Sequence, residues 1–462
     1  MPSSPHSIQP ASFRDPSGFI FWRDTTLLRQ VNTVYQPHYD QLMASGLYDE
    51  LVKAGLLIPH TEVDRALAAV PDSAYKVLQP QPIPFISYPH EWSYSQLRDS
   101  ALVTLEIQKR ALAHGMTLKD ASAYNCALFE GRPRLLDTLS LEQYEPGSPW
   151  IAYRQFCQHF LAPLALMRYT DVRLNQLFTT NIDGIPLDLA SKLLPMRSNF
   201  NLAIQVHIHM HAKSQRRYAG RKVETRQPKV SQQALLGMID NMESAIRKWH
   251  WNPAHTAWAD YYDQDSYTDP AFAHKRQVVA DYIAQASPAS VWDLGGNTGE
   301  FSQLASQHQI LTVSMDFDPG AVDLNYRQMI ETGDTHRYPL VIDLTAPTPA
   351  IGWANQERDS LVARGPADMV FGLALIHHLA IANNVPLPRL AAFFASLSRW
   401  AVIEFVPKSD PKVQTLLANR ADIFPDYTQA GFEAAFAPLF SVVQKTQIQD
   451  SQRWLYLLRT KD

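Results

Sequence analysis

The sequence has 462 residues, 46% of them hydrophobic and 19% charged, so the chain has room for about three domains of ~150 residues and is too apolar for an intrinsically disordered protein. Its 41 Lys and Arg residues against 45 Asp and Glu give a net charge of −4, which excludes a broad attraction to nucleic acid or anionic lipid and leaves only local patches for either. The two cysteines, Cys126 and Cys157, are too few for a disulfide framework or a four-thiolate zinc site.

No apolar run reaches the ~18 residues of a membrane-spanning helix, and the first fifteen residues lack the basic head and apolar run of a signal peptide. We therefore expect a cytoplasmic protein with no membrane partner. The sequence carries no indication of the oligomeric state.

The first part of the chain mixes strand and helix patterns, which predicts an α+β domain over residues 1–190. The predicted elements are strands at 18–24 and 26–32 and helices at 38–55 and 97–115. Gly55 and Gly115 end the two helices.

A connector is predicted over residues 191–265, with a helix at 231–251 and the domain linker in or before that helix. The aromatic stretch that follows contains Tyr261, Tyr262 and Tyr267, which are interpreted as a lid over a bound ligand or as core residues.

Asp120 and Asn125 have the Asp-x-x-x-x-Asn spacing of a kinase catalytic loop, and a predicted hairpin over 127–137 then leads to Asp137, where kinases hold magnesium. The domain therefore resembles a kinase-like phosphotransferase lobe, with residues 84–92 as the connection between lobes. It departs from kinases because Lys119 replaces an arginine, Thr-Leu follows Asp137, and neither a glycine-rich loop nor a convincing strand lysine is present. We expect a degenerate lobe without phosphotransfer; the alternative is a chance coincidence of these residues.

His207, His209 and His211 alternate, so all three would share a face on a strand, whereas only the first and third align on a helix. No nearby carboxylate or cysteine completes a zinc-ligand set, and we expect no metal. The following stretch, 213–229, contains seven basic residues and one acid, which favours a solvated charged face or contacts with phosphate groups of a substrate or nucleic acid.

The last domain, predicted over 266–462, has a regular α/β pattern. Five short apolar strands are expected at 290–295, 310–316, 339–344, 368–375 and 400–406, each separated from the next by enough residues for a crossover helix. Strands at 440–448 and 453–460 are too close together for a crossover and should pair as an antiparallel hairpin. The pattern predicts a parallel, doubly wound sheet closed by an antiparallel hairpin.

The strongest local signal is the glycine loop after the strand that ends at Asp293. Gly295 allows a sharp turn, and Gly299 permits close approach of a ligand to a helix that opens at about Thr298. The spacing fits neither a dinucleotide fingerprint, because Asn297 and Glu300 stand where glycines are needed, nor a phosphate-binding P-loop.

The loop, Asp-x-Gly-x-Asn-x-Gly, resembles the first motif of class I S-adenosylmethionine-dependent methyltransferases, with Asn297 where many members have glycine. The resemblance implies a Rossmann-like methyltransferase sheet that binds S-adenosylmethionine. It assigns Asp316, at the end of the second strand, to the ribose hydroxyls and Asp343 to the adenine amino group, while Asp318 precedes a proline and caps the next helix. The predicted cofactor-binding residues are Asp293, Gly295, Gly296, Asn297, Gly299, Asp316 and Asp343.

The candidate catalytic residues lie at the carboxyl edge of the sheet. His378 is the candidate general base, and His377, its neighbour on a strand end, should point the opposite way and pack. Glu404 lies in an apolar strand and requires partners, as a catalytic or a structural acceptor. Methyl transfer by positioning alone is the alternative.

The resemblance to the nodulation-protein-related methyltransferases of bacteria extends into the amino-terminal half and implies methyl transfer to an unidentified acceptor, with a small molecule or protein favoured. Nucleic-acid methylation is the rival, but Ile-His-His-Leu at 376–379 replaces the motif for exocyclic amines and this domain has no cysteine. The other alternative is a non-catalytic kinase-like binding module with a cofactor-sensing domain.

Overall fold

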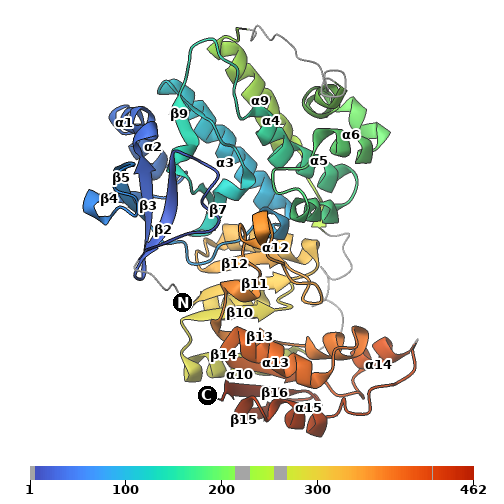
Figure 1. The fold of residues 1–462 in the computed structure, drawn as a ribbon. Helices are drawn as coiled ribbons and strands as arrows, with labels where there is room; N and C mark the ends of the chain where they lie inside the picture. The colour runs from blue at the N-terminus through green and yellow to red at the C-terminus, as the bar shows by residue number, and fades with distance from the viewer. Residues whose placement is uncertain (1–5, 214–228, 254–267, 419, 462) are drawn as a thin grey trace. The chain divides into compact units, whose positions relative to one another are not determined.

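The computed structural model describes residues 6–213, 229–253, 268–418 and 420–461 (Figure 1). The chain forms two compact units. The first contains residues 1–251 and a short excursion at 350–358, and the second contains residues 252–349 and 359–462.

The first unit begins with a five-stranded antiparallel sheet in the order β1-β2-β3-β5-β4. Its strands are β1 (His6–Ile8), β2 (Gly18–Arg23), β3 (Thr26–Asn32), β4 (His60–Val63) and β5 (Ala74–Pro80). The strands predicted at 18–24 and 26–32 are confirmed. The single helix predicted at 38–55 is wrong, because Gly46 adopts a left-handed conformation with φ +78° and separates α1 (Gln36–Ala44) from α2 (Leu47–Lys53).

A long helix, α3 (Tyr94–Ala113), follows the sheet and confirms the predicted helix that ends before Gly115. Two short antiparallel pairs come next: β6 (Met116–Leu118) with β9 (Leu141–Gln143), and β7 (Cys126–Phe129) with β8 (Arg132–Leu135). The second pair is the hairpin predicted before Asp137. Both cysteines are buried, as expected for small core residues.

The rest of the first unit is helical. Its main segments are α4 (Tyr153–Phe156), α5 (Ala162–Tyr169), α6 (Leu187–Leu193), α7 (Leu202–Ile204) and α9 (Gln232–Lys248), with π-helical turns at Cys157–Leu161 and Gln205–Met210. Residues 191–251, which the sequence analysis set apart in a connector, lie in this unit.

The second unit contains a seven-stranded sheet in the order β12-β11-β10-β13-β14-β16-β15. The first five strands in this order are parallel, and β16 is antiparallel to both of its neighbours. The strands are β10 (Ser290–Leu294), β11 (Leu311–Asp316), β12 (Arg337–Val341), β13 (Ala367–Gly372), β14 (Ser398–Phe405), β15 (Phe440–Gln447) and β16 (Trp454–Thr460). The predicted doubly wound sheet closed by a hairpin is confirmed.

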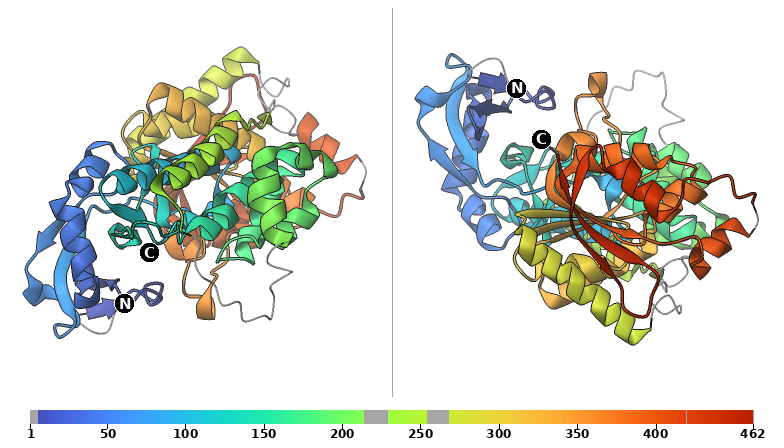
Figure 2. Two further views of the ribbon diagram at one scale, coloured as in Figure 1. Left: turned by 90° about the horizontal axis from the view of Figure 1, so that it is seen from above. Right: turned by 90° about the horizontal axis from the view of Figure 1, so that it is seen from below.

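Helices cover both faces of this sheet (Figure 2). One face packs on α10 (Asp269–Ala286) and α11 (Glu300–Ser306) through a buried apolar cluster that includes Val279, Phe301 and Phe371. The other strand face meets α13 (Leu387–Leu397), whose Phe394 lies against Gly372. The remaining helices of the unit are α12 (Pro319–Thr332), α14 (Pro411–Leu417) and α15 (Gln429–Phe436).

The described part of the chain contains no helix that combines the length and the apolarity needed to cross a lipid bilayer.

Candidate functional site

The glycine loop after β10 is tied to the end of the neighbouring strand. The N–H groups of Gly295 and Gly296 both donate to the Met315 carbonyl, at 2.8 and 2.9 Å. Gly295 has φ +76°, which confirms the predicted sharp turn. At Gly296 a Cβ would lie 2.5 Å from Ser314 Oγ, so protein packing itself requires glycine here.

Asn297 and Gly299 both have positive φ, +48° and +86°. Asparagine tolerates this region better than most residues, which explains how Asn297 takes a place where glycine is common. The close approach predicted at Gly299 exists, but the neighbour is not a ligand: a Cβ would lie 2.4 Å from Oδ1 of the buried Asn325. The helix opens at Glu300, after Gly299 as N-cap, rather than at Thr298.

Asp316, at the end of β11, is 7% exposed and accepts hydrogen bonds from the N–H groups of Asn297 (2.9 Å) and Asp318 (2.8 Å). Burial raises the pKa of its carboxyl to about 6, although these hydrogen bonds favour the ionised form. Asp318 accepts from Gly320 N–H at 2.7 Å, which confirms its predicted role as the cap of α12.

Asp293, at the end of β10, accepts a 2.6 Å hydrogen bond from Ser302 Oγ, and burial raises its pKa to about 6. Two adjacent strands therefore each end in a buried carboxyl with a raised pKa. Such perturbation by desolvation at a sheet edge is typical of functional sites.

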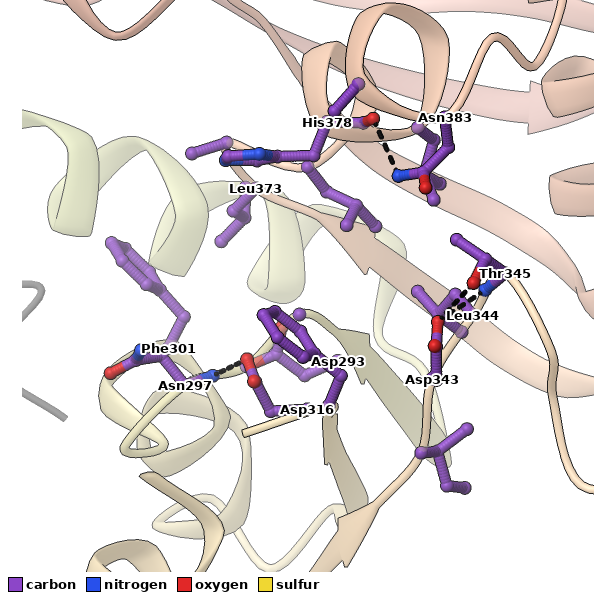
Figure 3. A pocket seen from close by; sticks show the side chains of 18 of the residues that line it. Asp293, Asn297, Phe301, Asp316, Asp343, Leu344, Thr345, Leu373, His378 and Asn383 are labelled. Carbon is purple, nitrogen blue, oxygen red and sulfur yellow. Dashed lines mark hydrogen bonds between the residues drawn. The ribbon is translucent and has the colours of Figure 1, made fainter. Parts of the chain in front are cut away.

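A pocket of about 370 Å³ opens at the carboxyl ends of the parallel strands (Figure 3). Of the seven predicted cofactor-binding residues, all but Gly299 line it. Asp343, in the loop after β12, is exposed and accepts from both N–H and Oγ1 of Thr345, at 2.8 and 2.7 Å. Apolar side chains including Phe317, Leu344 and Leu373 complete the wall.

His378 lines the same pocket, whereas His377 is fully buried with its ring centroid 4.2 Å from that of His378. The strand before them ends at Gly372, and His378 starts a π-helical turn. The predicted strand-end alternation is therefore wrong: the two residues lie at the start of a helical turn, their rings lie beside each other, and of the two only His378 lines the pocket. Burial lowers the pKa of both rings, that of His377 well below its usual value.

Glu404, on β14, is fully buried within an ion-pair network. Its Oε2 lies 2.7 Å from Lys275 Nζ and its Oε1 lies 3.3 Å from Arg453 Nη1. Arg453 in turn binds Asp410 at 2.7 Å. Glu404 thus meets the requirement for partners.

Lys275, on α10, lines the pocket and was missed by the sequence analysis. Its ammonium is 4.5 Å from the Phe301 ring centroid, and burial lowers its pKa against the opposing effect of Glu404. Its position in the sequence could have identified it, because Lys275 lies four residues after the buried Ala271 and four before the buried Val279. This spacing places a lysine on the core-facing stripe of a helix.

In the first unit, Asp120 accepts from Ser122 N–H (3.0 Å) and from Gln155 Nε2 (2.8 Å). Burial, with the nearby charge of Asp137, raises its pKa. Asn125 donates to Ser140 Oγ at 3.2 Å and to Asp120. The predicted spacing therefore does bring these residues together.

Asp137 accepts from Leu139 N–H at 2.7 Å and forms an ion pair with Arg29 Nη2 of β3 at 2.5 Å. Lys119 reaches Asp15 Oδ2 at 3.0 Å and Ser17 Oγ at 2.8 Å, in the connection between β1 and β2. In place of a strand lysine, Arg29 on β3 provides the basic side chain that pairs with Asp137.

The three alternating histidines lie on helix rather than strand. His207 contacts Tyr153 Oη at 2.6 Å and Asn241 Oδ1 at 3.1 Å, and His209 contacts two serine hydroxyls. Over the described ranges, no group of three or more His, Cys, Asp or Glu is arranged to hold a metal ion. Tyr261, Tyr262, Tyr267 and most of 213–229 lie outside the described residues.

No family model matches the chain. Among solved structures, the bifunctional kinase-methyltransferase WbdD aligns with 44% of this chain at 17% identity and TM-score 0.31, and the chain spans 42% of WbdD. Magnesium protoporphyrin IX methyltransferase from Synechocystis PCC 6803, with bound SAH, aligns with 44% of this chain and 92% of its own length, at 18% identity and TM-score 0.32. The N-methyltransferase NodS from Bradyrhizobium japonicum WM9 aligns with 42% of this chain and 98% of its own, at 9% identity and TM-score 0.31.

A relative identified by sequence aligns with this chain over nearly the whole length of both proteins. The nodulation protein NoeA of Rhizobium meliloti (strain 1021) is 35% identical over 454 residues, which cover 96% of this chain and 94% of that protein. The alignment includes both units, so the likeness is not confined to the common sheet of the second one. The chain belongs to the NoeA family.

Proposed function

We propose that the second unit binds S-adenosylmethionine in the pocket and transfers its methyl group to an acceptor. The observation that carries this proposal is the placement of Asp293, Asp316 and Asp343 on one pocket, at the carboxyl edge of three adjacent strands. Ligands of doubly wound sheets bind at this edge. The donor carries a pair of ribose hydroxyls, an adenine amino group and an ammonium. Each of these groups can donate a hydrogen bond to a carboxylate.

The charges of the lining indicate how the donor lies. Asp316 and Asp343 take the ribose and the adenine, with Phe317 beside them as an apolar wall. At the other end, Asp293 faces the ammonium, and Lys275 is the one lysine or arginine among the described residues that line the pocket. We assign Lys275 to the donor carboxylate. This orientation points the sulfonium toward His378.

When bound, S-adenosylmethionine supplies an electrophilic methyl group to a nucleophile. His378 is held neutral by burial, so its ring can accept the proton that an acceptor hydroxyl or amine loses. Leu373, Leu375 and Leu379 also line the pocket and give it apolar surface. The acceptor is a small molecule or protein that presents a nucleophile to this end.

Calorimetry with S-adenosylmethionine and the full chain tests the proposal. Replacing Asp316 by Ala removes a charged acceptor of two ribose hydrogen bonds and should weaken binding by ~1.5 to 3 kcal/mol. Asp318→Asn, which removes a neighbouring carboxylate and keeps a capping side chain, should bind as the wild type does. Unchanged affinity in Asp316→Ala contradicts the assignment.

For the first unit we infer a degenerate kinase-like lobe that does not transfer phosphate. The sheet order, the β6–β9 and β7–β8 pairs and the contact between Asp120 and Asn125 support the kinase-like interpretation. Asp137 is engaged by Arg29, and the connection between β1 and β2 lacks the glycines that cover phosphates in kinases. Incubation with radiolabelled ATP and a cell extract should show no transfer above that of Asp120→Ala.

A further inference from the structure

The segment that joins α6 to the helix ending near Lys213 has an inverted pattern of burial. Six apolar side chains, here called the 193–210 face, are 37 to 93% exposed: Leu193, Met196, Phe200, Leu202, Val206 and Met210. The polar His207 and His209 on the same segment are only 3 and 7% exposed. Apolar side chains normally take the inner positions, so this arrangement requires an explanation.

Hydrogen bonds hold the segment in this orientation. His209 contacts Ser191 Oγ at 2.8 Å and Ser198 Oγ at 3.2 Å, while His207 contacts Tyr153 and Asn241. Ile204 and Ile208 fill the core between these contacts. The inner side of the segment is thus anchored by both polar and apolar groups. If the helix rotated, the buried groups that now bond to the two histidines would lose these hydrogen bonds.

The exposed side is a continuous stripe. Leu202, Val206 and Met210 follow one another at intervals of four residues along the helix that comprises α7 and the π-helical turn, so they share one side of it. Phe200 and Met196, the two most exposed, come from the turn that leads into this helix. The segment follows α6, which is labelled in Figure 1.

The charged side chains within residues 189–213 have one sign. Lys192, Arg197 and Lys213 are exposed, and the sequence contains no acidic residue from 189 to 213. These three basic residues give the described stretch 189–213 a net charge of +3, whereas the whole chain carries −4.

We propose that the 193–210 face docks on the surface of an anionic lipid bilayer. Such a surface combines phosphate headgroups, which attract lysine and arginine, with an acyl boundary that accepts phenylalanine, methionine and leucine side chains. A second copy of this chain would bring two like-charged faces together, which their repulsion opposes. Nucleic acid matches the cations but leaves the aliphatic side chains in water.

Sedimentation of the full chain with vesicles tests this proposal independently of the methyl-donor pocket. The chain should co-sediment with vesicles of phosphatidylcholine and phosphatidylglycerol, and much less with phosphatidylcholine alone. Raising the salt concentration should release it, because the charge contribution is screened. Phe200→Ser and Met196→Ser should each lower partitioning about tenfold, since each removes an exposed apolar side chain that the bilayer would bury. Both residues are 86% or more exposed, so the fold should remain intact, which circular dichroism verifies.

Phe13→Ser is the matched control, because Phe13 is a 54% exposed phenylalanine of the same unit outside this face. It should bind vesicles as the wild type does. Equal binding to neutral and anionic vesicles, or unchanged binding of Phe200→Ser, overturns the proposal. So does a lipid-free dimer that Phe200→Ser dissociates, which would assign the face to a second copy, or binding to duplex DNA without binding to vesicles.

Discussion

The two units each bring carboxylates and a basic side chain together, with opposite consequences. In the second unit, Asp293, Asp316 and Lys275 all line a pocket. In the first, Asp120 accepts three hydrogen bonds from its own unit, and Asp137 is held by Arg29. Sequence spacing predicted that the carboxylates of each unit lie near one another, but a ligand site also requires that their remaining acceptor capacity face a cavity.

The largest effect is expected at the buried ion pair behind the donor pocket. Lys275→Met removes one ion-pair partner of the buried Glu404 and should lower the free energy of unfolding by about 3 kcal/mol. Lys275→Met/Glu404→Gln should recover much of this stability in urea unfolding. In that double variant, affinity for S-adenosylmethionine should fall by at least tenfold while affinity for methylthioadenosine, which lacks the carboxylate, is kept. An equal loss for both ligands would place the carboxylate elsewhere.

Variants of His377 and His378 test the part of the pocket where methyl transfer is proposed to occur. His378→Ala should lower turnover by ~10²-fold and donor affinity little, because the ring lines the pocket beyond the donor. Formation of S-adenosylhomocysteine with a metabolite extract measures the rate. His377→Leu keeps volume in a fully buried site and should retain turnover, since neither ring nitrogen of His377 has a hydrogen-bond partner among the described residues. Wild-type turnover in His378→Ala would leave positioning as the whole mechanism.

Gly299 and Gly333 both have positive φ, so comparing them separates the cost of a steric clash from the cost of the left-handed backbone conformation. At Gly299 a Cβ would strike Asn325, whereas at Gly333, φ +66°, a Cβ would meet nothing within 4 Å. Gly333→Ala should therefore cost about 1 kcal/mol for the left-handed conformation, and Gly299→Ala about 2 kcal/mol more for the clash. Thermal unfolding of both variants measures the difference. Equal destabilisation would show that Asn325 moves aside freely.

The raised pKa values of Asp293 and Asp316, both about 6, give the donor site a pH dependence. The folded chain binds more protons than the unfolded chain between about pH 4 and 6, so the ligand-free protein should lose stability as pH rises through that window. The cationic donor favours ionised carboxyls, and its affinity should fall by up to about tenfold per pH unit below pH 6 for each of the two carboxyls. Calorimetry from pH 5 to 8 tests this; a flat profile would contradict the raised values.

The smallest effect is expected in the first unit. Asp137→Asn keeps a side-chain acceptor for Leu139 N–H and loses only the partly buried ion pair with Arg29, so stability should fall by about 1 kcal/mol. Donor binding to the second unit should not change. Either a gain of phosphoryl transfer in Asp137→Asn, or the loss in that variant of a transfer that the wild type shows, would contradict the conclusion that Arg29 closes off the Asp137 site.

The sequence by itself determined what local chemistry decides. The positive φ at Gly295, the cap at Asp318 and the β7–β8 hairpin depend on neighbouring residues, and all were predicted. The sheet of the second unit was predictable for the same reason, because its apolar strands and their spacing impose crossovers and a final hairpin. The break at Gly46 was also local, but a single glycine within a helical pattern does not reveal its φ.

Tertiary structure decided what each polar group does. Lys275 meets Glu404 only when α10 packs on the sheet, and Arg29 meets Asp137 only when β3 approaches the loop after β8. The neighbour that requires Gly299 is Asn325, from a different helix. The outward side chains of Met196 and Phe200 depend on the partners that His209 finds. Each depends on burial and on partners distant in the chain, which set the energy of a polar group and are not written in its local pattern.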